Sequence, residues 1–432
     1  MTWTAKEKTL ENSTLGERVV ERTHSSGATV AFCRKPGYLR RYACFSTHFG
    51  SVDDRYRIGG GEEICLPDGV AHFLEHKMFE GPEEDAFQQF SRLGAMANAF
   101  TSFVGTTYLF SCTDHFYPCL DHLVNFVQTP HFTSENVEKE KGIIGQEIRM
   151  YADHPGWRVY FNLLAGLYKR HPVAKDIAGT EQTIAEITPA LLQECWSAFY
   201  HPSNMILLAV GDEDENEFFE VADRLLSQRD MGPDPAIERI LTSEDPGPAR
   251  KEIRESMQVG RPKLLFGWKD IHRGLSGQEL MRKELVTEVL LECIFGQSGT
   301  LFEDLYGRGL IDESFGASYQ IHSDVGHCVV GGDVSDPENL IEMVQEQIER
   351  IRSTGIDPSD VERHRRSAIG HLLRAFNSLD HIAGNYCGAR FLDTNPFEVV
   401  DLLAEITPED IDRRLQEYLL PQEMSCSLVV PG

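Results

Sequence analysis

The segment His72-Phe73-Leu74-Glu75-His76 places two imidazoles four residues apart, with a carboxylate between them. In a helix, residues i and i+4 lie on one face and residue i+3 lies beside them. The apolar neighbours Val70, Ala71 and Met78 favour a helix here, and Pro67-Asp68 before them offers a cap. Two neutral imidazoles on one turn can bind zinc, and the carboxylate between them can accept a proton from water. The segment therefore predicts a helical zinc site with the pattern H-x-x-E-H.

The alternative interpretation of these five residues is a buried helix that carries two histidines and a glutamate without a metal. Such a pentad is rare by chance in a chain of this length, so the metal is favoured. A zinc site also needs a third protein ligand, which must come from another part of the chain.

A later helix, predicted from Ser134 to Asp153, supplies two candidates for that ligand. Glu140 and Glu147 fall on or beside its apolar stripe, which consists of Val137, Ile144, Ile148 and Tyr151. A carboxylate that faces a core is costly unless it is paired, hydrogen-bonded or bound to a metal. A structural salt bridge would explain one such glutamate. Two of them, downstream of the H-x-x-E-H segment, favour a metal.

Four stretches of the chain resemble motifs of the pitrilysin/insulinase family of inverzincin metallopeptidases, whose relatives include the mitochondrial processing peptidase. They are His72 to His76, Glu140-Lys-Gly-Ile-Ile-Gly-Gln-Glu147, Gly94-Ala-Met-Ala-Asn98-Ala99-Phe100-Thr101 and Tyr200-His201-Pro202-Ser203-Asn204-Met205. The resemblance covers nearly the whole chain. It is strongest to the bacterial processing-peptidase-like branch of YmfH-type proteins, which are usually encoded beside a metal-less relative.

This resemblance implies one zinc ion per chain, with His72, His76 and Glu147 as ligands. It implies that Glu75 is the general base and that Glu140 steadies the site from behind the ligands. The stretch Asn98-Ala99-Phe100-Thr101 resembles the family's edge strand, to which an extended peptide adds by main-chain hydrogen bonds. Without the family, that stretch would be an ordinary sheet edge.

Length, charge and cysteine usage limit the class of protein. A chain of 432 residues suggests two domains. No apolar run approaches membrane-spanning length, and the N-terminus lacks the apolar core of a secretory signal. The ten cysteines form no CxxC pair and mostly lie in apolar segments, which predicts reduced thiols and a cytoplasmic protein. The net charge of −27 argues against binding of nucleic acid or of anionic membranes.

Two pairs of similar segments indicate an internal duplication. Ile184-Ala-Glu-Ile-Thr-Pro189 is repeated as Leu403-Ala-Glu-Ile-Thr-Pro408, and Asn136-Val-Glu-Lys139 corresponds to Asp360-Val-Glu-Arg363. Both pairs occur in the same order along the chain, which chance explains poorly. The sequence therefore predicts an α+β fold of two homologous domains, each with a mostly antiparallel sheet packed with helices.

The predicted domains are residues 1–230, which carry the zinc site, and residues 251–432, which do not. Residues 231–250 are rich in proline, glycine and acidic residues, as in an exposed linker. Within the first domain, residues 28–33 and 41–50 alternate like strands, and two antiparallel strands joined by a Pro-Gly loop fit them.

The second half departs from the first where the chemistry would lie. It has no H-x-x-E-H, and His364 and His371 stand opposite Glu140 and Glu147, more in keeping with ordinary helix residues than with a second metal site. Larger relatives carry F-x-x-L-R-x-x-x-Q-L-G-Y in this half, with an Arg and a Tyr near the scissile carbonyl. Here Tyr306 occupies the Arg position and Glu313 the Tyr position.

The resulting prediction is a zinc-dependent endopeptidase that cleaves short or unfolded peptides by metal-activated water inside a dimer chamber. The partner would be a second copy of the chain or a homologous metal-less subunit that supplies the Arg and the Tyr. A non-catalytic or partner-dependent subunit of a heterodimeric peptidase complex is the alternative, although such subunits usually lose the ligands or the base. A metal-dependent hydrolase with a non-peptide substrate has no support in the sequence.

Overall fold

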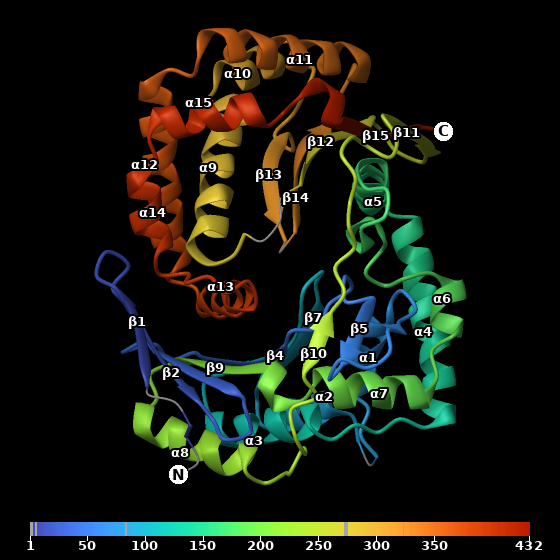
Figure 1. The fold of residues 1–432 in the computed structure, drawn as a ribbon, viewed down its shortest axis with the longest axis vertical. Coiled ribbons are helices and arrows are strands. Elements are labelled where there is room, and N and C mark those ends of the chain that lie inside the picture. Colours follow the sequence, from blue (N-terminus) through green and yellow to red (C-terminus); the bar gives the residue numbers. More distant parts are fainter. Residues whose placement is uncertain (1–2, 5–6, 83, 272–274, 323) are drawn as a thin grey trace.

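Two sheets, one in each half of the chain, organise the computed structural model (Figure 1), which describes residues 3–4, 7–82, 84–271, 275–322 and 324–432. The first has the order β1-β2-β3-β9-β4-β8-β7, with β1 Lys8–Asn12, β2 Glu17–Thr23, β3 Thr29–Arg34, β4 Arg41–Thr47, β7 Met96–Thr101, β8 Thr106–Cys112 and β9 Met205–Gly211. The second has the order β11-β15-β12-β14-β13, with β11 Glu252–Met257, β12 Lys263–Ile271, β13 Gly316–Ile321, β14 Val325–Asp333 and β15 Met424–Pro431.

The two sheets repeat one topology, which confirms the predicted duplication. The run β3-β9-β4-β8-β7 has the same pairing directions as β11-β15-β12-β14-β13. In each run the first two strands are parallel and every later pair is antiparallel. The fold is therefore α+β with mostly antiparallel sheets, as the sequence predicts.

The predicted pair of adjacent strands within residues 28–50 is wrong in one respect. Strands β3 and β4 form where expected and run in opposite directions, but β9 lies between them and bonds to both. All seven residues of β9, Met205 to Gly211, are buried. A strand this apolar is most stable at the centre of a sheet, with hydrogen bonds on both sides, and so it displaces the direct pairing of its neighbours in sequence.

Helices flank both sheets. Those of the first half are α1 Val70–Met78, α2 Ala86–Arg92, α3 Phe116–Val127, α4 Ser134–Ala152, α5 Pro155–Leu167, α6 Glu181–Ala185, α7 Pro189–Phe199 and α8 Glu215–Leu226. Those of the second half are α9 Gly277–Phe295, α10 Thr300–Gly307, α11 Pro337–Thr354, α12 Pro358–Ala375, α13 Leu379–Phe391, α14 Val399–Glu405 and α15 Pro408–Glu417. Within the described ranges no single helix is long and apolar enough to cross a membrane, although the bent pair of α9 and α10 meets that length and composition together.

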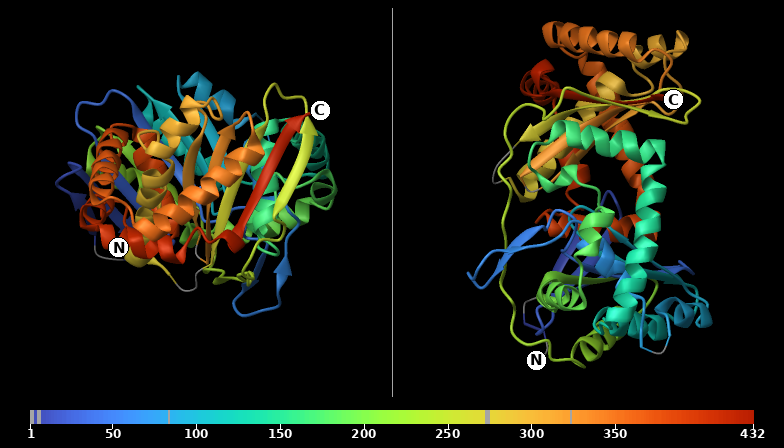
Figure 2. Two further views of the ribbon diagram at one scale, coloured as in Figure 1. Left: turned by 90° about the horizontal axis from the view of Figure 1, so that it is seen from above. Right: turned by 90° about the vertical axis from the view of Figure 1, so that its right-hand side faces the viewer.

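One helix from each half packs on the sheet of the other half. Helix α4 rises beside the first sheet, and α5 then crosses the second sheet (Figure 2), where it packs on β12 and β15. Reciprocally, α13 packs on β4 and β9 of the first sheet. Its buried face, which includes Ile382, Ala383 and Tyr386, completes an apolar cluster with that sheet. The boundaries at residues 230 and 251 remain a prediction, since both cores depend on a helix from the other half.

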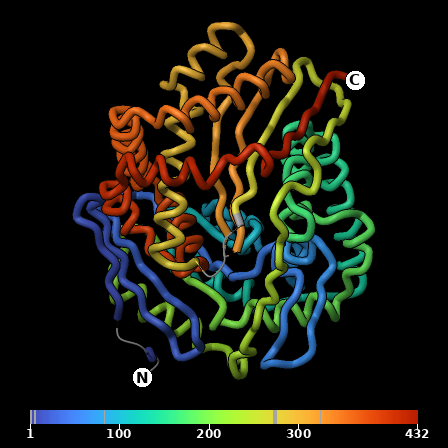
Figure 3. The backbone as a smooth tube through the Cα atoms, turned by 45° about the horizontal axis from the view of Figure 1, so that its top comes forward, coloured from blue at the N-terminus to red at the C-terminus, as the bar shows by residue number. Residues whose placement is uncertain are grey.

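Residues 231–250 form a strap between the halves (Figure 3) that is mostly exposed or half-buried. Within it, β10 Ile237–Arg239 pairs with β5 Arg55–Ile58, which also pairs with β6 Ile64–Cys65. Glu244 is the exception to the predicted exposure, because its side chain is fully buried. The linker is therefore anchored to the rest of the molecule rather than free.

Glu244 joins both halves through hydrogen bonds. Its carboxylate accepts the backbone N–H groups of Lys169, Arg170 and His171, each at 2.9 Å. The ammonium of Lys269 on β12 donates to the same carboxylate at 2.8 Å. Burial alone would raise the pKa of Glu244, but these hydrogen bonds outweigh it and hold the pKa at about 2.

Replacing Glu244 should therefore destabilise the fold. Glu244→Gln leaves the buried Lys269 ammonium without its counter-charge, and we expect a loss of about 3 kcal/mol in the free energy of unfolding, measured in urea at pH 7. Because the folded-state pKa is depressed, the stabilisation is present above the unfolded value of roughly 4.5 and fades as the pH falls towards about 2. Glu238→Gln, at an exposed position of the same strap, should change stability by less than about 0.5 kcal/mol. Equal effects of the two variants would contradict this assignment.

Candidate metal centre

The N-terminus of helix α1 is not capped by Pro67-Asp68 as predicted. Its N-cap is Gly69, whose φ of 92° lies in the left-handed region, and no side chain caps the helix. A Cβ at Gly69 would lie 2.4 Å from the carbonyl oxygen of Ala178, so this close approach also requires glycine. The carboxylate of Asp68 instead accepts the Lys175 ammonium at 2.8 Å. The predicted helix forms, but its start is fixed by tertiary contact.

Helix α4 is positioned by a local signal that the sequence does carry. Thr133 accepts the backbone N–H of Asn136, and the Asn136 side chain accepts that of Thr133, which forms a capping box. The helix then packs against α1. Its face towards α1 carries Glu140 and Glu147, as predicted.

His72, His76 and Glu147 converge in the structure. Nε2 of His72 lies 3.8 Å from Oε1 of Glu147, and Nε2 of His76 lies 3.5 Å from Oε2. These separations are too long for good hydrogen bonds. Ligand atoms of a tetrahedral zinc at about 2.0–2.1 Å lie roughly 3.3 Å apart, which is close to the observed spacing. One ligand atom from each of the three residues lies within 4.8 Å of the others, so the donor set fits a zinc ion.

Glu140 lies behind His76 rather than beside the predicted ion. Its Oε1 is 3.1 Å from Nδ1 of His76, which leaves Nε2 directed at Glu147. Its Oε2 lies 3.7 Å from the ammonium of Lys77, a completely buried residue that also pairs with Glu80. Burial opposes both charges, yet this contact raises the pKa of His76 and lowers that of Glu140. Sequence reasoning missed Lys77, because a lysine in an amphipathic helix is normally exposed.

His72 and Glu147 have different environments. Burial, with the nearby His76, lowers the pKa of His72 to about 4, so its imidazole is neutral and able to bind a metal at neutral pH. The hydroxyl of Tyr151, one turn along α4, donates to Oε1 of Glu147 at 2.6 Å. Tyr151 was expected only as part of the apolar stripe, but it also holds a predicted ligand.

Glu75 lies beside the three donors but is not one of them. The hydroxyl of Thr101 on β7 donates to its Oε2 at 2.6 Å. Glu75 is 8 % exposed, and burial raises the pKa of its carboxyl group. A buried carboxylate with a raised pKa is suited to accept and return a proton.

The stretch from Asn98 to Thr101 lies on β7, as predicted, at one end of the first sheet. Within the described residues β7 pairs only with β8, so its other edge is open. Met96, Asn98 and Phe100 are exposed, while the residues between them are half-buried. The strand packs on α1, which sets its open edge near the candidate centre.

Tyr306 and Glu313 do not join the site. Tyr306 belongs to α10, which lies near the top of the second half, whereas α1 lies in the first half below it (Figure 1), and the residue is 48 % exposed. Glu313, beyond the end of that helix, is exposed. Neither the sequence of this segment nor its position provides an Arg or a Tyr at the centre.

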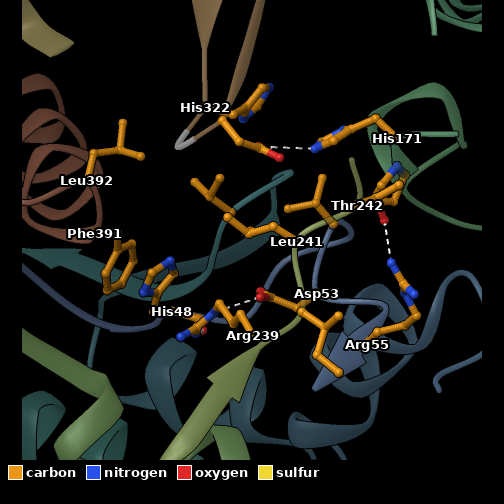
Figure 4. Close-up of a pocket in the computed structure, with 15 residues that line it drawn as sticks. His48, Asp53, Arg55, His171, Arg239, Leu241, Thr242, His322, Phe391 and Leu392 are labelled. Carbon is orange, nitrogen blue, oxygen red and sulfur yellow. Dashed lines mark hydrogen bonds and ion pairs between the residues drawn. The ribbon is translucent and has the colours of Figure 1, made fainter. Parts of the chain in front are cut away.

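A separate cavity of about 270 Å³ lies where the two halves and the strap meet (Figure 4). His171 pairs with Asp324 at 3.3 Å and Arg239 pairs with Asp53 at 2.6 Å, while the guanidinium of Arg55 donates to the hydroxyl of Thr242 at 2.8 Å. His48 stacks on Phe391 of α13. Burial, and to a smaller extent the charge of Arg239, lower the pKa of His48 to about 3. These contacts tie the halves together rather than form a reactive set.

Comparison with known proteins identifies relatives of both halves. The family model described as Insulinase (Peptidase family M16) matches residues 62–181, and the model described as Peptidase M16 inactive domain matches residues 186–368. The uncharacterized zinc protease YmfH of Bacillus subtilis is 41% identical over 98% of this chain and 99% of its own. The crystal structure of an M16-like peptidase from Alicyclobacillus acidocaldarius has a TM-score of 0.92 at 36% identity, with both chains covered completely.

Pitrilysin has a similar fold at greater sequence distance. Its crystal structure matches with a TM-score of 0.76 and 15% identity, and all of this chain corresponds to 47% of that chain. The present fold thus spans about half of the pitrilysin chain.

The contact between Glu140 and His76 predicts a pH-dependent metal affinity. A protonated imidazole cannot bind zinc, so affinity should fall as the pH decreases through the raised pKa of His76. Glu140→Gln should weaken zinc binding at pH 8 by about 10–100-fold, because His76 becomes less basic and less well oriented. The same substitution should also lower the pH at which the zinc affinity is lost.

Competition with a chromophoric chelator at several pH values would measure both effects. Glu138→Gln is the matched control, because Glu138 lies on the same helix with its side chain 75% exposed. The interpretation fails if the control weakens zinc binding as much as Glu140→Gln does.

Proposed function

The chain belongs to the insulinase family of peptidases (peptidase family M16), and on that premise we propose that it is a zinc-dependent endopeptidase of short or unfolded peptides. The observation that carries the proposal is the convergence of His72, His76 and Glu147 with Glu75 at their side. The identity to YmfH, named a zinc protease, supports the same metal and the same class of reaction.

In this proposal His72, His76 and Glu147 hold one zinc ion, which when bound supplies Lewis-acid polarisation of the scissile carbonyl and of a water molecule. Glu75 takes a proton from the attacking water as its oxygen bonds to the carbonyl carbon. Glu75 then returns the proton to the amide nitrogen as the C–N bond breaks. Tyr151 and Glu140 orient the ligands from behind, and Thr101 holds one oxygen of Glu75.

The substrate would bind as an extended segment along the open edge of β7, over Asn98 to Thr101. Main-chain hydrogen bonds to a strand edge do not depend on sequence, which suits an enzyme of varied unfolded peptides. Phe100 and Met96 are exposed on this strand at 45 % and 78 % and offer apolar contacts to substrate side chains.

We further propose that a second subunit completes the site, either another copy of this chain or a homologous metal-less one. Two observations support this: the chain corresponds to 47% of pitrilysin, and Tyr306 and Glu313 occupy the positions of the family's Arg and Tyr. A wholly non-catalytic role is less well supported, because all three metal donors and Glu75 are present and converge. All ten cysteines are free thiols, in keeping with a reducing, cytoplasmic location.

Glu75→Gln tests the proposed role of the general base. The amide keeps the hydrogen bond from Thr101 but cannot accept the proton, so hydrolysis of a fluorogenic peptide should fall by about 10²–10⁴-fold. Zinc content, measured by elemental analysis, should stay at one ion per chain. Glu62→Gln, at an exposed position just before β6, should keep full activity. Retained hydrolysis in Glu75→Gln would rule out the proposed mechanism.

Assembly is tested by comparing the purified chain with mixtures. Alone, the chain should hydrolyse peptides weakly, and addition of a homologous subunit that lacks H-x-x-E-H but carries the Arg/Tyr segment should raise kcat without altering the zinc content. If the chain forms an active homodimer, dilution below its dissociation constant should instead abolish activity. Full activity as a monomer would refute the proposed need for a partner.

A further inference from the structure

The second half contains a cavity at the position equivalent to the candidate metal centre. Helix α9 packs on the edge strand β13 and on α12, just as α1 packs on the edge strand β7 and on α4. The space bordered by α9, α12 and β13 is a cavity of about 410 Å³. Its size is within the range of small-molecule binding sites.

Acid and base have exchanged places between the two halves. In the first half, Nδ1 of His76 on α1 lies 3.1 Å from a Glu140 oxygen on α4. In the second half, an oxygen of Glu292 on α9 lies 3.8 Å from Nδ1 of His364 on α12. One turn earlier on α9, Glu288 stands where the first half has an imidazole, and the pattern H-x-x-E-H becomes E-x-x-L-E.

The exchanged set does not form a second metal centre. Among the described residues, the three donors of the first half are the only group that approaches closely enough to hold an ion. In the second half the cavity stays open between α9 and α12, and Glu288, Glu292, His364 and His371 all line it.

Among the residues that the structure describes, Glu288 and Glu292 have no lysine or arginine partner, and the imidazole of His364 is the basic group that contacts Glu292. Within the described ranges Glu288 has no hydrogen-bond or ion-pair partner. Solvent reaches it, but the surrounding protein desolvates it, and with the nearby charges of Glu284 and Glu292 this raises its pKa to about 8. His364 supplies little positive charge, since burial lowers its pKa. A ligand that brings a positive charge would relieve this unfavourable arrangement.

Most of the other residues that line the cavity are apolar, and Ser318, Tyr319, Ser367 and His381 are the polar ones among them. Leu285 and Val289 of α9, Ala317 of β13 and Leu372 of α12 line it, together with Leu403 of α14. A charged group attached to a methylene chain would match such a lining, because the chain packs on the apolar wall while the head meets the carboxylates. An inorganic cation would leave that wall without a partner.

We propose that this cavity binds an aliphatic cation, an alkylammonium or alkylguanidinium group, whose head pairs with Glu288 and Glu292. The group could belong to a lysine or arginine of a peptide or to a free polyamine. The site goes beyond the proposed peptidase activity, and its occupancy does not require hydrolysis.

Calorimetric titration of the full chain tests the proposal, with Glu75→Gln present throughout so that no peptide is cleaved. The probes are spermidine, the blocked peptide acetyl-Ala-Arg-Ala-Ala-amide and the same peptide with citrulline in place of arginine, all at one ionic strength. Glu288→Gln should weaken binding of a cationic probe at least tenfold, and Glu288→Gln with Glu292→Gln should abolish it at this site. Because Glu288 has no hydrogen-bond or ion-pair partner among the described residues that the substitution would remove, thermal unfolding of Glu288→Gln should show no loss of stability.

Glu279→Gln is the matched control, because it removes the same charge from an exposed position of α9 outside the cavity. It should alter binding by less than twofold. Binding of the arginine peptide alone identifies a peptide side chain as the ligand, and binding of spermidine alone identifies a free polyamine. The proposal is overturned if neither cationic probe binds, if Glu288→Gln weakens binding of the citrulline peptide as much as binding of the arginine peptide, or if Glu279→Gln weakens binding as much as Glu288→Gln.

Discussion

The packing of α1 against α4 is the contact on which the candidate metal centre depends. It brings a carboxylate from one helix to the imidazoles of the other, and the donor atoms stop at 3.5 to 3.8 Å, which is too far for good hydrogen bonds. Spacings of this size match those between the ligand atoms of a single zinc ion. The surrounding contacts, from Tyr151 to Glu147 and from Glu140 to His76, keep the donors in place.

An internal duplication explains why the two halves share one topology and yet carry different side chains in equivalent grooves. The same five-strand topology occurs twice, and each copy sends one helix, α5 or α13, across to the sheet of the other. The two halves thus form one folded unit, fastened further by the buried Glu244 in the strap. Within that shared frame the grooves have opposite chemistry, since His76–Glu140 in one half corresponds to Glu292–His364 in the other.

Under the two proposed assignments, this inversion would give a duplicated groove a different ligand without a change of fold. Imidazoles on α1 can bind a metal when a carboxylate from α4 faces them. In the proposed cation site, carboxylates in the same positions would instead pair with the head of an aliphatic cation, whose chain packs on the apolar wall. Interchanging the side chains of two facing helices therefore changes what the groove can bind, while the packing of helix on strand is conserved.

The sequence by itself determined the elements whose signals are local. The spacing of His72, Glu75 and His76, the capping box at Thr133, the repeated Ile-Thr-Pro segments and the strands on either side of Gly105 all follow from residues close together in the chain. Only the tertiary structure decided the insertion of β9 between β3 and β4, the exchange of α5 and α13, and the contacts of Lys77, Thr101 and Glu244. These features join residues far apart in the chain, and their energies depend on burial and on which groups meet. The periodicity and spacing of residues within one segment indicate neither how deeply a side chain is buried in the fold nor which distant group it contacts.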